Sequence, residues 1–295
     1  MRVEKLKLFI ELYESRNYTK TARKNYISQA ALSQYVSSLE NQFNAVFFDR
    51  SVSPIQPTSI GTLFYEQAQI LYTQYLSMVD TIEAEMSNKS LPLRIGYTSP
   101  LDVQCFLPYL PMVTASDPDL DVKPIKIPVE DATNYLEKNV CDVVVSFRRI
   151  PTDENIHGIP FHTGTFYCMV NYKHPLAEKE SVTAEEIYKY PVATLSEHAL
   201  GGYKEYMLEK LNALGITPNI IATRENFESL VFEVISNNAV SFVSDEQISK
   251  SISQYVKVLP ITDGTHKFTI SLYYSKDNKH RKLGTLLDVI KSNMS

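Results

Sequence analysis

The chain has 295 residues, of which 44% are hydrophobic and 21% are charged, and its formal net charge is −5. The length suits two or three domains with an ample core, and the composition is typical of a soluble globular protein. We expect no contact with a membrane, because no apolar run approaches the roughly 20 residues of a membrane helix and no secretory signal fits residues 1–14.

The three cysteines are Cys105, Cys141 and Cys168, and they form no Cys-x-x-Cys pair. Widely spaced cysteines in odd number are typical of a reduced compartment and argue against a disulfide framework or a zinc site. The sequence therefore predicts a cytoplasmic protein with buried, structural thiols.

The charge is divided unevenly along the chain. Residues 1–60 hold eight Lys and Arg against five Asp and Glu, a net charge of +3. The remaining residues hold 21 against 29, a net charge of −8. If the protein meets a polyanion, the N-terminal part is the part expected to meet it.

Three helices are predicted at the N-terminus. Apolar residues at helical spacing in residues 3–13 indicate the first helix. Thr19 is placed to cap a second, short helix that ends near Asn25, and Ser28 is placed to cap a third that runs to about Phe43. The apolar stripe of this third helix is expected to face the core; it consists of Leu32, Val36, Leu39 and Phe43.

A short strand and return are predicted next. Asn44 can take a left-handed conformation and end the third helix. Residues 45–51 then predict a short strand, and the Pro-rich residues 53–59 a return with little freedom.

A long helix is predicted over residues 61–87, which contain no Gly or Pro after Gly61. Its apolar residues are spaced 4, 3, 4, 3 and 4 apart, as in the seam of a coiled coil; they are Phe64, Ala68, Leu71, Tyr75, Met78 and Ile82. A helix lying on a globular body is the plainer alternative. The polar residues 87–92 favour a dimerising linker helix.

From residue 91 onward, short apolar strands alternate with helical segments. Strands are predicted at 93–99, 121–127, 141–147, 165–172, 190–195, 218–224, 239–243, 256–261 and 268–274. The main helical segments are predicted at 102–113, 130–139, 203–214 and 226–237, with a closing helix from about Lys279. This alternation predicts parallel sheets with crossover helices, arranged as two small α/β lobes. Pro124 indicates that its strand lies at an edge, and Gly201 and Gly202 are expected to shape a turn.

The third helix carries an unusual polar face. Opposite its apolar stripe lie Gln29, Ser33 and Ser37, with Gln34 beside them, where Lys and Glu would be the common choice. Gln and Ser offer donors and acceptors in compact form, and a Gln can pair with adenine in the major groove. Backbone N–H groups at the helix start can meet phosphate. An ordinary three-helix subdomain is the alternative, but the pattern favours a helix-turn-helix.

Residues 9–61 resemble the winged helix-turn-helix of the LysR-type transcriptional regulators. The resemblance rests on "NYTKTARKNYISQAALSQYVSSLENQF", "FFDR" at 47–50 and "PTSIG" at 57–61. Weaker matches occur downstream at "LRIGYTS", "HPLAEKESVTAEEI" and "VLPI", so that the resemblance covers nearly the whole chain.

The resemblance implies an α/β protein in three parts. Residues 1–60 would form the DNA-binding domain, with its helix-turn-helix at about 18–37, and residues 61–89 the linker and dimerisation helix. Residues 90–295 would form a type-2 periplasmic-binding-protein-like effector domain. Its lobe I would be about 90–161 and 267–295, and its lobe II about 162–266. The implied partners are double-stranded DNA, a small effector and further copies of the chain in a homodimer or homotetramer.

The resemblance also implies roles for single residues. Those expected to face DNA from the recognition helix are Ser28, Gln29, Ala30, Ser33 and Gln34. Thr19 and Arg50 would contact the DNA backbone, and Phe64, Leu71, Tyr75, Met78 and Ile82 would join the subunits.

Two departures from the family pattern bear on DNA recognition. Gln34 stands where the family usually has Arg, and the wing residues 51–57 lack the basic side chains that are often found there. Losing the Arg removes a common guanine contact and one unit of counterion release. We therefore expect an A·T-richer contact and a shallow salt dependence.

An effector site is predicted where strands end, because ligands of parallel α/β folds bind outside the carboxyl ends of strands. The residues at these ends are Thr98, Ser99, Phe147, Arg148, Leu195 and Ser196. Hydroxyls and Arg148 could hold a small organic anion, with Arg148 pairing a carboxylate. Capping of the following helices is the alternative role for the hydroxyls.

Catalytic and metal-binding motifs do not occur in the sequence: there is no His-Glu-x-x-His, Gly-x-Ser-x-Gly, Gly-x-Gly-x-x-Gly or Walker pattern. We therefore expect no enzyme activity, cofactor or metal. The alternative function is a cytoplasmic solute-binding protein without DNA binding, and the Gln/Ser face argues against it.

Overall fold

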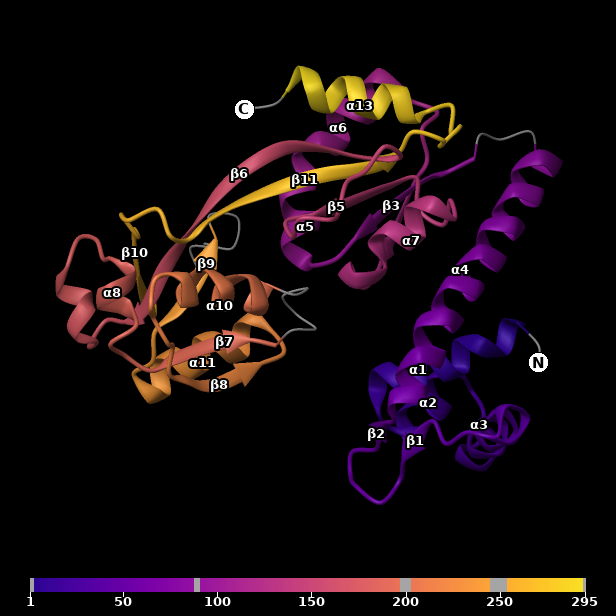
Figure 1. Cartoon of the computed structure of the whole chain (residues 1–295), viewed down its shortest axis with the longest axis horizontal. Coiled ribbons are helices and arrows are strands. Elements are labelled where there is room, and N and C mark those ends of the chain that lie inside the picture. The colour runs from indigo at the N-terminus through magenta and orange to yellow at the C-terminus, as the bar shows by residue number, and fades with distance from the viewer. Residues whose placement is uncertain (1–2, 88–90, 197–202, 245–253, 294–295) are drawn as a thin grey trace. The chain divides into compact units, whose positions relative to one another are not determined.

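The computed structural model describes residues 3–87, 91–196, 203–244 and 254–293. The chain divides into two compact units, Met1–Leu91 and Pro92–Ser295 (Figure 1). Among the described residues, none of the helices has the length and hydrophobicity that crossing a bilayer requires.

The first unit is helical with a small sheet. Its helices are η1 (Val3–Lys5), α1 (Leu6–Ser15), α2 (Tyr18–Lys24), α3 (Gln29–Phe43) and α4 (Ser59–Ser87). Strands β1 (Phe48–Asp49) and β2 (Gln56–Pro57) pair antiparallel between α3 and α4. The core is aromatic: the ring of Phe9 lies 5.4 Å from Phe47, 5.3 Å from Phe48 and 4.7 Å from Phe64, measured between centroids. Helix α4 is therefore fastened to this core by its first turns.

The predicted ends of α3 are confirmed. Ser28 is the N-cap, and its hydroxyl accepts from the backbone N–H of Ala31 at 3.1 Å. Asn44 ends the helix at φ 48°, in the left-handed region. The prediction for Phe43 is wrong: its side chain is half-exposed, because it lies on the last turn of the helix, although its ring contacts Phe47 and Phe64.

The prediction that Thr19 caps α2 is wrong. Asn17 is the N-cap, with φ −144°, and its side-chain oxygen accepts from the backbone N–H of Lys20 at 2.9 Å. Helix α2 begins at Tyr18, which places Thr19 in the first turn, where its hydroxyl is turned to another partner.

Gly61 has a steric reason within α4. A Cβ atom at this position would lie 2.0 Å from the carbonyl oxygen of Phe47. Only glycine allows the start of α4 to pack this closely on the residue that precedes β1.

The second unit is built on one long mixed sheet. The strand order is β10-β6-β11-β5-β3-β4, and β9 also pairs with β6. These strands are β3 (Leu93–Tyr97), β4 (Val122–Lys126), β5 (Val143–Ser146), β6 (Ile156–Asn171), β9 (Ser241–Ser244), β10 (Val256–Leu259) and β11 (Lys267–Ser275). Strands β7 (Val192–Leu195) and β8 (Ile220–Arg224) form a separate pair.

Helices cover the strands in two groups. The group near β3, β4 and β5 comprises α5 (Pro100–Phe106), η2 (Leu107–Tyr109), α6 (Leu110–Ser116), η3 (Val129–Asp131), α7 (Ala132–Glu137) and α13 (Leu283–Ser292). The other comprises η4 (Pro175–Glu178), α8 (Ala184–Ile187), α10 (Tyr203–Ala213) and α11 (Phe227–Asn237). Figure 1 shows the two lobes with β6 and β11 running from one toward the other.

The prediction of parallel sheets holds only in part. Strand β3 pairs in parallel with β4 and β5, and β7 with β8. Strands β6, β9, β10 and β11 are antiparallel neighbours. The sequence pattern predicted only the part of β6 from residue 165 onward, because Gly158, Pro160 and Gly164 interrupt the apolar alternation before it.

Two smaller predictions concern prolines. The helix predicted over 102–113 is broken into α5, η2 and α6, with Pro108 and Pro111 at the breaks. Pro124 lies in β4 at the end of the strand order, which confirms the predicted edge. The turn expected at Gly201 and Gly202 lies outside the described residues.

Candidate functional site

Helix α3 presents a polar face to solvent. Its buried stripe consists of Leu32, Val36 and Leu39, which pack against the aromatic core. On the other side Gln29, Ala30 and Gln34 are exposed, and Ser33 and Ser37 are half-buried. The described side chains of this face carry no charge, so that the surface can read hydrogen-bonding groups rather than only attract phosphate.

The turn before α3 is tight. Tyr26 takes φ 55°, and Ile27 is half-buried on the same core as Leu32. Across this turn the Thr19 hydroxyl donates to Oε1 of Gln29 at 3.1 Å. Both residues are exposed, and the bond orients the Gln29 amide with its N–H groups left to donate outward.

Cations on α2 lie beside this polar face. Lys20 and Arg23 are exposed on the helix that precedes the turn, and Arg23 lies in its last turn. They were not singled out from the sequence, although their spacing of three residues places them on one side of the helix. They add positive charge on the helix that precedes α3.

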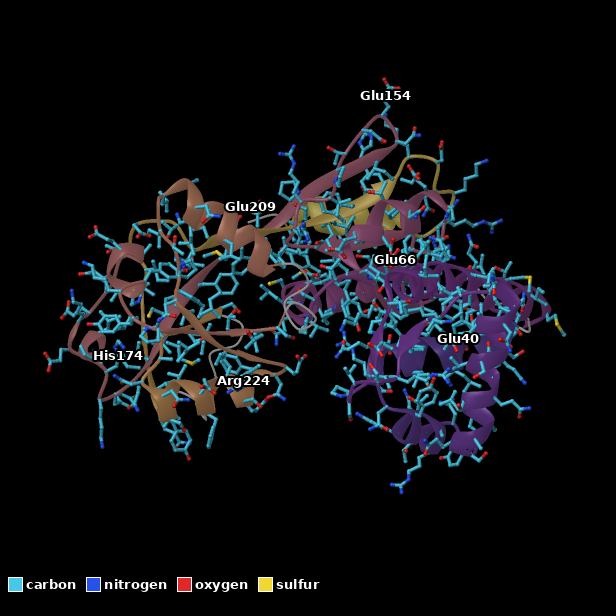
Figure 2. The ribbon with its side chains drawn as sticks, turned by 60° about the horizontal axis from the view of Figure 1, so that its bottom comes forward. Glu40, Glu66, Glu154, His174, Glu209 and Arg224 are labelled. Atoms are coloured by element: carbon cyan, nitrogen blue, oxygen red, sulfur yellow. The ribbon has the colours of Figure 1, made fainter. Side chains whose placement is uncertain are left out.

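Arg50 is held within the first unit. Its Nη2 atom lies 2.7 Å from Oε2 of Glu40, and its guanidinium lies over the ring of Tyr18, 5.7 Å from the centroid. The other carboxylate oxygen of Glu40, a residue labelled in Figure 2, accepts from the backbone N–H of Phe47 at 2.8 Å. Glu40 therefore ties α3 to the β1–β2 hairpin and fixes Arg50 near the start of α2.

The seam of α4 divides into two parts. Phe64 and Ala68 belong to the core of the first unit, where Phe64 stacks on Phe47 at 4.5 Å between centroids. Farther along the helix, Leu71 is 40% exposed, and Met78 and Ile82 are each 52% exposed. These three form an apolar stripe in the single chain.

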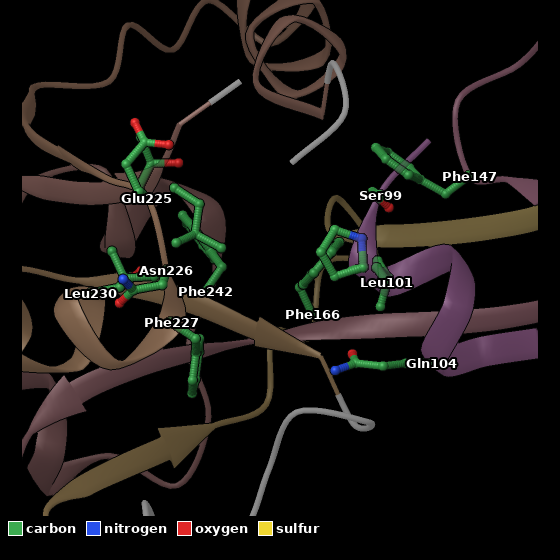
Figure 3. Close-up of a pocket in the computed structure, with 14 residues that line it drawn as sticks. Ser99, Leu101, Gln104, Phe147, Phe166, Glu225, Asn226, Phe227, Leu230 and Phe242 are labelled. Atoms are coloured by element: carbon green, nitrogen blue, oxygen red, sulfur yellow. The ribbon is translucent and has the colours of Figure 1, made fainter. Parts of the chain in front are cut away.

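The cavity of the second unit lies between the two lobes and measures about 240 Å³. Figure 3 shows Ser99, Leu101 and Phe147 on one side, and Glu225, Leu230 and Phe242 on the other. The described residues that line it are Ser99, Pro100, Leu101, Gln104, Phe147, Phe166, Thr194, Leu195, Glu225, Asn226, Phe227, Leu230, Ser241 and Phe242. Most of these side chains are apolar, and among the lining residues that the structure describes Glu225 alone is charged.

Three of the six predicted effector residues line the cavity: Ser99, Phe147 and Leu195. Thr98 is buried behind Ser99, and Ser196 donates to Oε2 of Glu225 at 2.8 Å. Arg148 does not line the cavity, and its Nη1 atom lies 3.2 Å from Oε1 of Glu130.

Asp102 organises the lobe I wall and was missed in the sequence. It is 0% exposed and accepts from the backbone N–H groups of Thr98 at 2.9 Å, Ser99 at 2.7 Å and Phe147 at 2.9 Å. The Thr98 hydroxyl also donates to it, at 2.7 Å. Burial raises the pKa of Asp102 to about 6, against the opposing effect of these hydrogen bonds. The signal was available, since Ser99 and Asp102 stand three apart, as in a capping box.

A second hollow of about 570 Å³ shares the lining residue Phe147 with the interlobe cavity. Its lining includes Arg149, Lys210 and Lys267, and the first and last of these are exposed. The Lys210 ammonium donates to the carbonyl oxygen of Lys267 at 3.3 Å. The basic side chains of this region are thus separate from the lining of the interlobe cavity.

All three cysteines are buried, as predicted, and burial raises the pKa of Cys168 to about 12. Over the part of the chain that the structure describes, no group of His, Cys, Asp and Glu could hold a metal ion.

Comparisons with known proteins cover both units. The family model described as "Bacterial regulatory helix-turn-helix protein, lysR family" matches residues 3–62, and the model described as "LysR substrate binding domain" matches residues 88–295. The chain is 23% identical over 298 residues to the HTH-type transcriptional regulator CysL of Bacillus subtilis, covering 99% of this chain and 98% of that protein. It is 22% identical to the hydrogen peroxide-inducible genes activator of Haemophilus influenzae, covering 93% and 90% of the two chains.

Solved structures share the fold. The crystal structure of CbnR, a LysR family transcriptional regulator, matches with a TM-score of 0.65 at 17% identity, covering all of both chains. The structure of full-length CbnR complexed with its target DNA matches with a TM-score of 0.64 at 18% identity, covering 99% of this chain and 100% of that one.

Proposed function

The chain belongs to the LysR family of transcriptional regulators, and we propose that it binds specific DNA through residues 1–60 under the control of a small effector. In this proposal residues 61–89 join the subunits and residues 90–295 hold the effector between lobe I and lobe II. The protein acts in the cytoplasm, where the DNA is, and it acts by binding rather than by catalysis.

The observation that carries the DNA-binding proposal is the uncharged polar face of α3. Ser28, Gln29, Ala30, Ser33 and Gln34 lie at the start of this helix, opposite its buried stripe. The helix can enter the major groove with this end first, as recognition helices do. Gln29 and Gln34 would contact base edges, and the Ser28 cap would lie close to phosphate.

Contacts to the DNA backbone would come from the elements around α3. Thr19 would contact phosphate from its place at the turn. Its hydroxyl also donates to Oε1 of Gln29 at 3.1 Å and so orients the Gln29 amide. Arg50 is fixed by Glu40 and Tyr18 at the edge of the polar face, and Lys20 and Arg23 add two further cations. These contacts set the register of the protein on DNA without reading its sequence.

Pairing of chains through α4 explains the exposed stripe on that helix. Leu71, Tyr75, Met78 and Ile82 would pack against a second copy, while Phe64 anchors the helix in the core of its own chain. A dimer presents two recognition helices to half-sites about one helical turn apart.

Effector control follows from the position of the cavity. Ser99 and Phe147 belong to one lobe and Leu195 to the other, with Thr98, Arg148 and Ser196 behind or beside them. A ligand that contacts both lobes favours the lobe arrangement that it fits. That preference is what can change the DNA-bound assembly, because a ligand with equal affinity for two arrangements shifts nothing.

A nuclease footprint on the DNA upstream of the protein's own gene tests the DNA-binding proposal. The intact chain should protect a region with dyad symmetry, and Gln29→Ala should weaken the protection. Gln42→Ala is the matched control, because Gln42 is exposed on the last part of the same helix. Equal effects of the two substitutions, or no protection at low salt, would refute the assignment of the polar face.

A further inference from the structure

The described lining of the interlobe cavity carries a negative charge, which bears on the chemistry of its ligand. We propose that it takes a small aromatic molecule with a protonated amine, which pairs with Glu225, rather than an organic anion. The inference rests on the proposed function, in that it takes this cavity as the effector site.

The lobe I wall offers no cradle for an anion, because the chain's own carboxylate fills it. The backbone N–H groups at the ends of β3 and β5 would be the natural donors to a bound anion. In this chain the N–H groups of Thr98, Ser99 and Phe147 all donate to Asp102, at 2.7–2.9 Å. A second anion beside Asp102 would find these donors occupied and a like charge behind them.

The lobe II wall is arranged in the same way. Helix α11 begins beside the cavity, and its N-cap residue Asn226 accepts from the backbone N–H of Ser229 at 2.9 Å. Glu225 precedes this cap and adds a negative charge where the helix end would otherwise favour an anion. Asn226 and Glu225 of the chain itself therefore complement the positive end of the α11 dipole.

Among the described lining residues, Glu225 carries the charge, and the hydroxyl and amide side chains beside it can both donate and accept hydrogen bonds. Glu225 receives a hydrogen bond from Ser196 on one oxygen, and no ion pair with a described residue engages it. The Oε1 atom of Gln104 is buried and accepts no hydrogen bond from any described residue. Arg148, the cation expected here, is paired with Glu130 away from the lining. A ligand that donates hydrogen bonds and carries positive charge fits these groups.

The size and walls of the cavity indicate the rest of the ligand. A cavity of roughly 150 Å³ holds a benzene molecule, and this one measures about 240 Å³. That volume suits one aromatic ring with a short side chain. Phe147, Phe166 and Phe242 line it and offer ring faces and edges for such a group.

The test compares three probes that share a phenyl ring and a short chain: 2-phenylethylamine, 2-phenylethanol and 3-phenylpropanoate. Titration calorimetry on the full chain at pH 7 should find the amine binding roughly three- to tenfold more tightly than the alcohol, since Glu225 is exposed and partly screened. The acid should not displace the amine.

Three variants test whether Glu225 causes the preference for the amine. Glu225→Gln should abolish the preference of amine over alcohol, whereas Glu228→Gln, an exposed acid of α11 outside the lining, should leave it unchanged. Arg149→Gln, in the second hollow, should also leave it unchanged. Equal affinity for amine and alcohol, a preference that survives Glu225→Gln, displacement of the amine by the acid, or no binding of any probe would overturn the inference.

A footprint of each protein, made in parallel, separates the two proposals. If the operator is protected but the amine preference is absent, the ligand inference alone fails. If protection is also absent, the proposed function fails as well.

Discussion

Replacing Asp102 by alanine should destabilise the second unit while leaving the first unit intact. The substitution removes the acceptor of four hydrogen bonds, three from backbone N–H groups and one from the Thr98 hydroxyl. A buried donor that loses its acceptor costs about 1–3 kcal/mol. At about 2 kcal/mol each, the middle of this range, the four donors together would cost about 8 kcal/mol.

Two effects reduce this cost. Burial raises the pKa of Asp102 from 3.8 to about 6, so that the charged carboxylate is disfavoured in the folded chain by about 3 kcal/mol, and this disappears with the side chain. Water from the adjacent cavity can also reach the freed donors at Ser99 and Phe147. We therefore expect a net loss of about 3 kcal/mol in the free energy of unfolding at pH 7.

The pH dependence provides an independent check. The folded-state pKa of Asp102 is raised, so that the folded chain binds the proton more tightly than the unfolded chain. Its contribution to stability must therefore increase as the pH falls through about 6. Between pH 7 and pH 5 the difference in free energy of unfolding between the unsubstituted protein and Asp102→Ala should increase by about 1 kcal/mol.

Urea unfolding followed by circular dichroism at pH 7 and pH 5 measures both quantities. Asp288→Ala is the control, because Asp288 is exposed on α13 in the same unit, and its loss should stay within about 0.5 kcal/mol. A loss below about 1 kcal/mol for Asp102→Ala, or a difference that decreases at pH 5, would refute this account of the network.

Four further outcomes are expected. Burial lowers the pKa of His266 from 6.5 to about 4, so the free energy of unfolding should fall by about 3 kcal/mol as the pH drops through this range. In urea unfolding at a series of pH values, His266→Gln should remove this part of the pH dependence. Gln34→Arg should steepen the salt dependence of DNA binding by about one phosphate contact, measured by fluorescence anisotropy; an unchanged slope would place the side chain away from DNA. Met78→Glu should weaken self-association in sedimentation experiments, and an unaltered oligomer would show that the α4 stripe is not an interface. Gly61→Ala should lower the stability of the first unit by about 3 kcal/mol in calorimetry, because its Cβ would meet the Phe47 carbonyl; a normal transition would mean that α4 can shift at little cost.

Local patterns in the sequence were enough to place most of the elements. The Ser28 cap, the buried stripe of Leu32, Val36 and Leu39, and the left-handed Asn44 follow from short-range hydrogen bonding and helical periodicity, and the structure confirms each of them. The cap of α2 was misassigned because Asn17 and Thr19 are both good caps, and only the packing of Tyr18 decides between them.

The sequence by itself determined the family, the polar face of α3 and the strand ends near the cavity, because each depends on residues close together in the chain. Tertiary structure alone decided the antiparallel course of β6, since strand direction depends on partners far away in sequence. It also decided the character of the cavity. Asp102 and Phe147 are 45 residues apart in sequence, and the hydrogen bond between them occupies a backbone donor beside the cavity. The hydrogen-bond partner of a carboxylate cannot be read from the sequence when the two residues are far apart in the chain, because only folding brings them together.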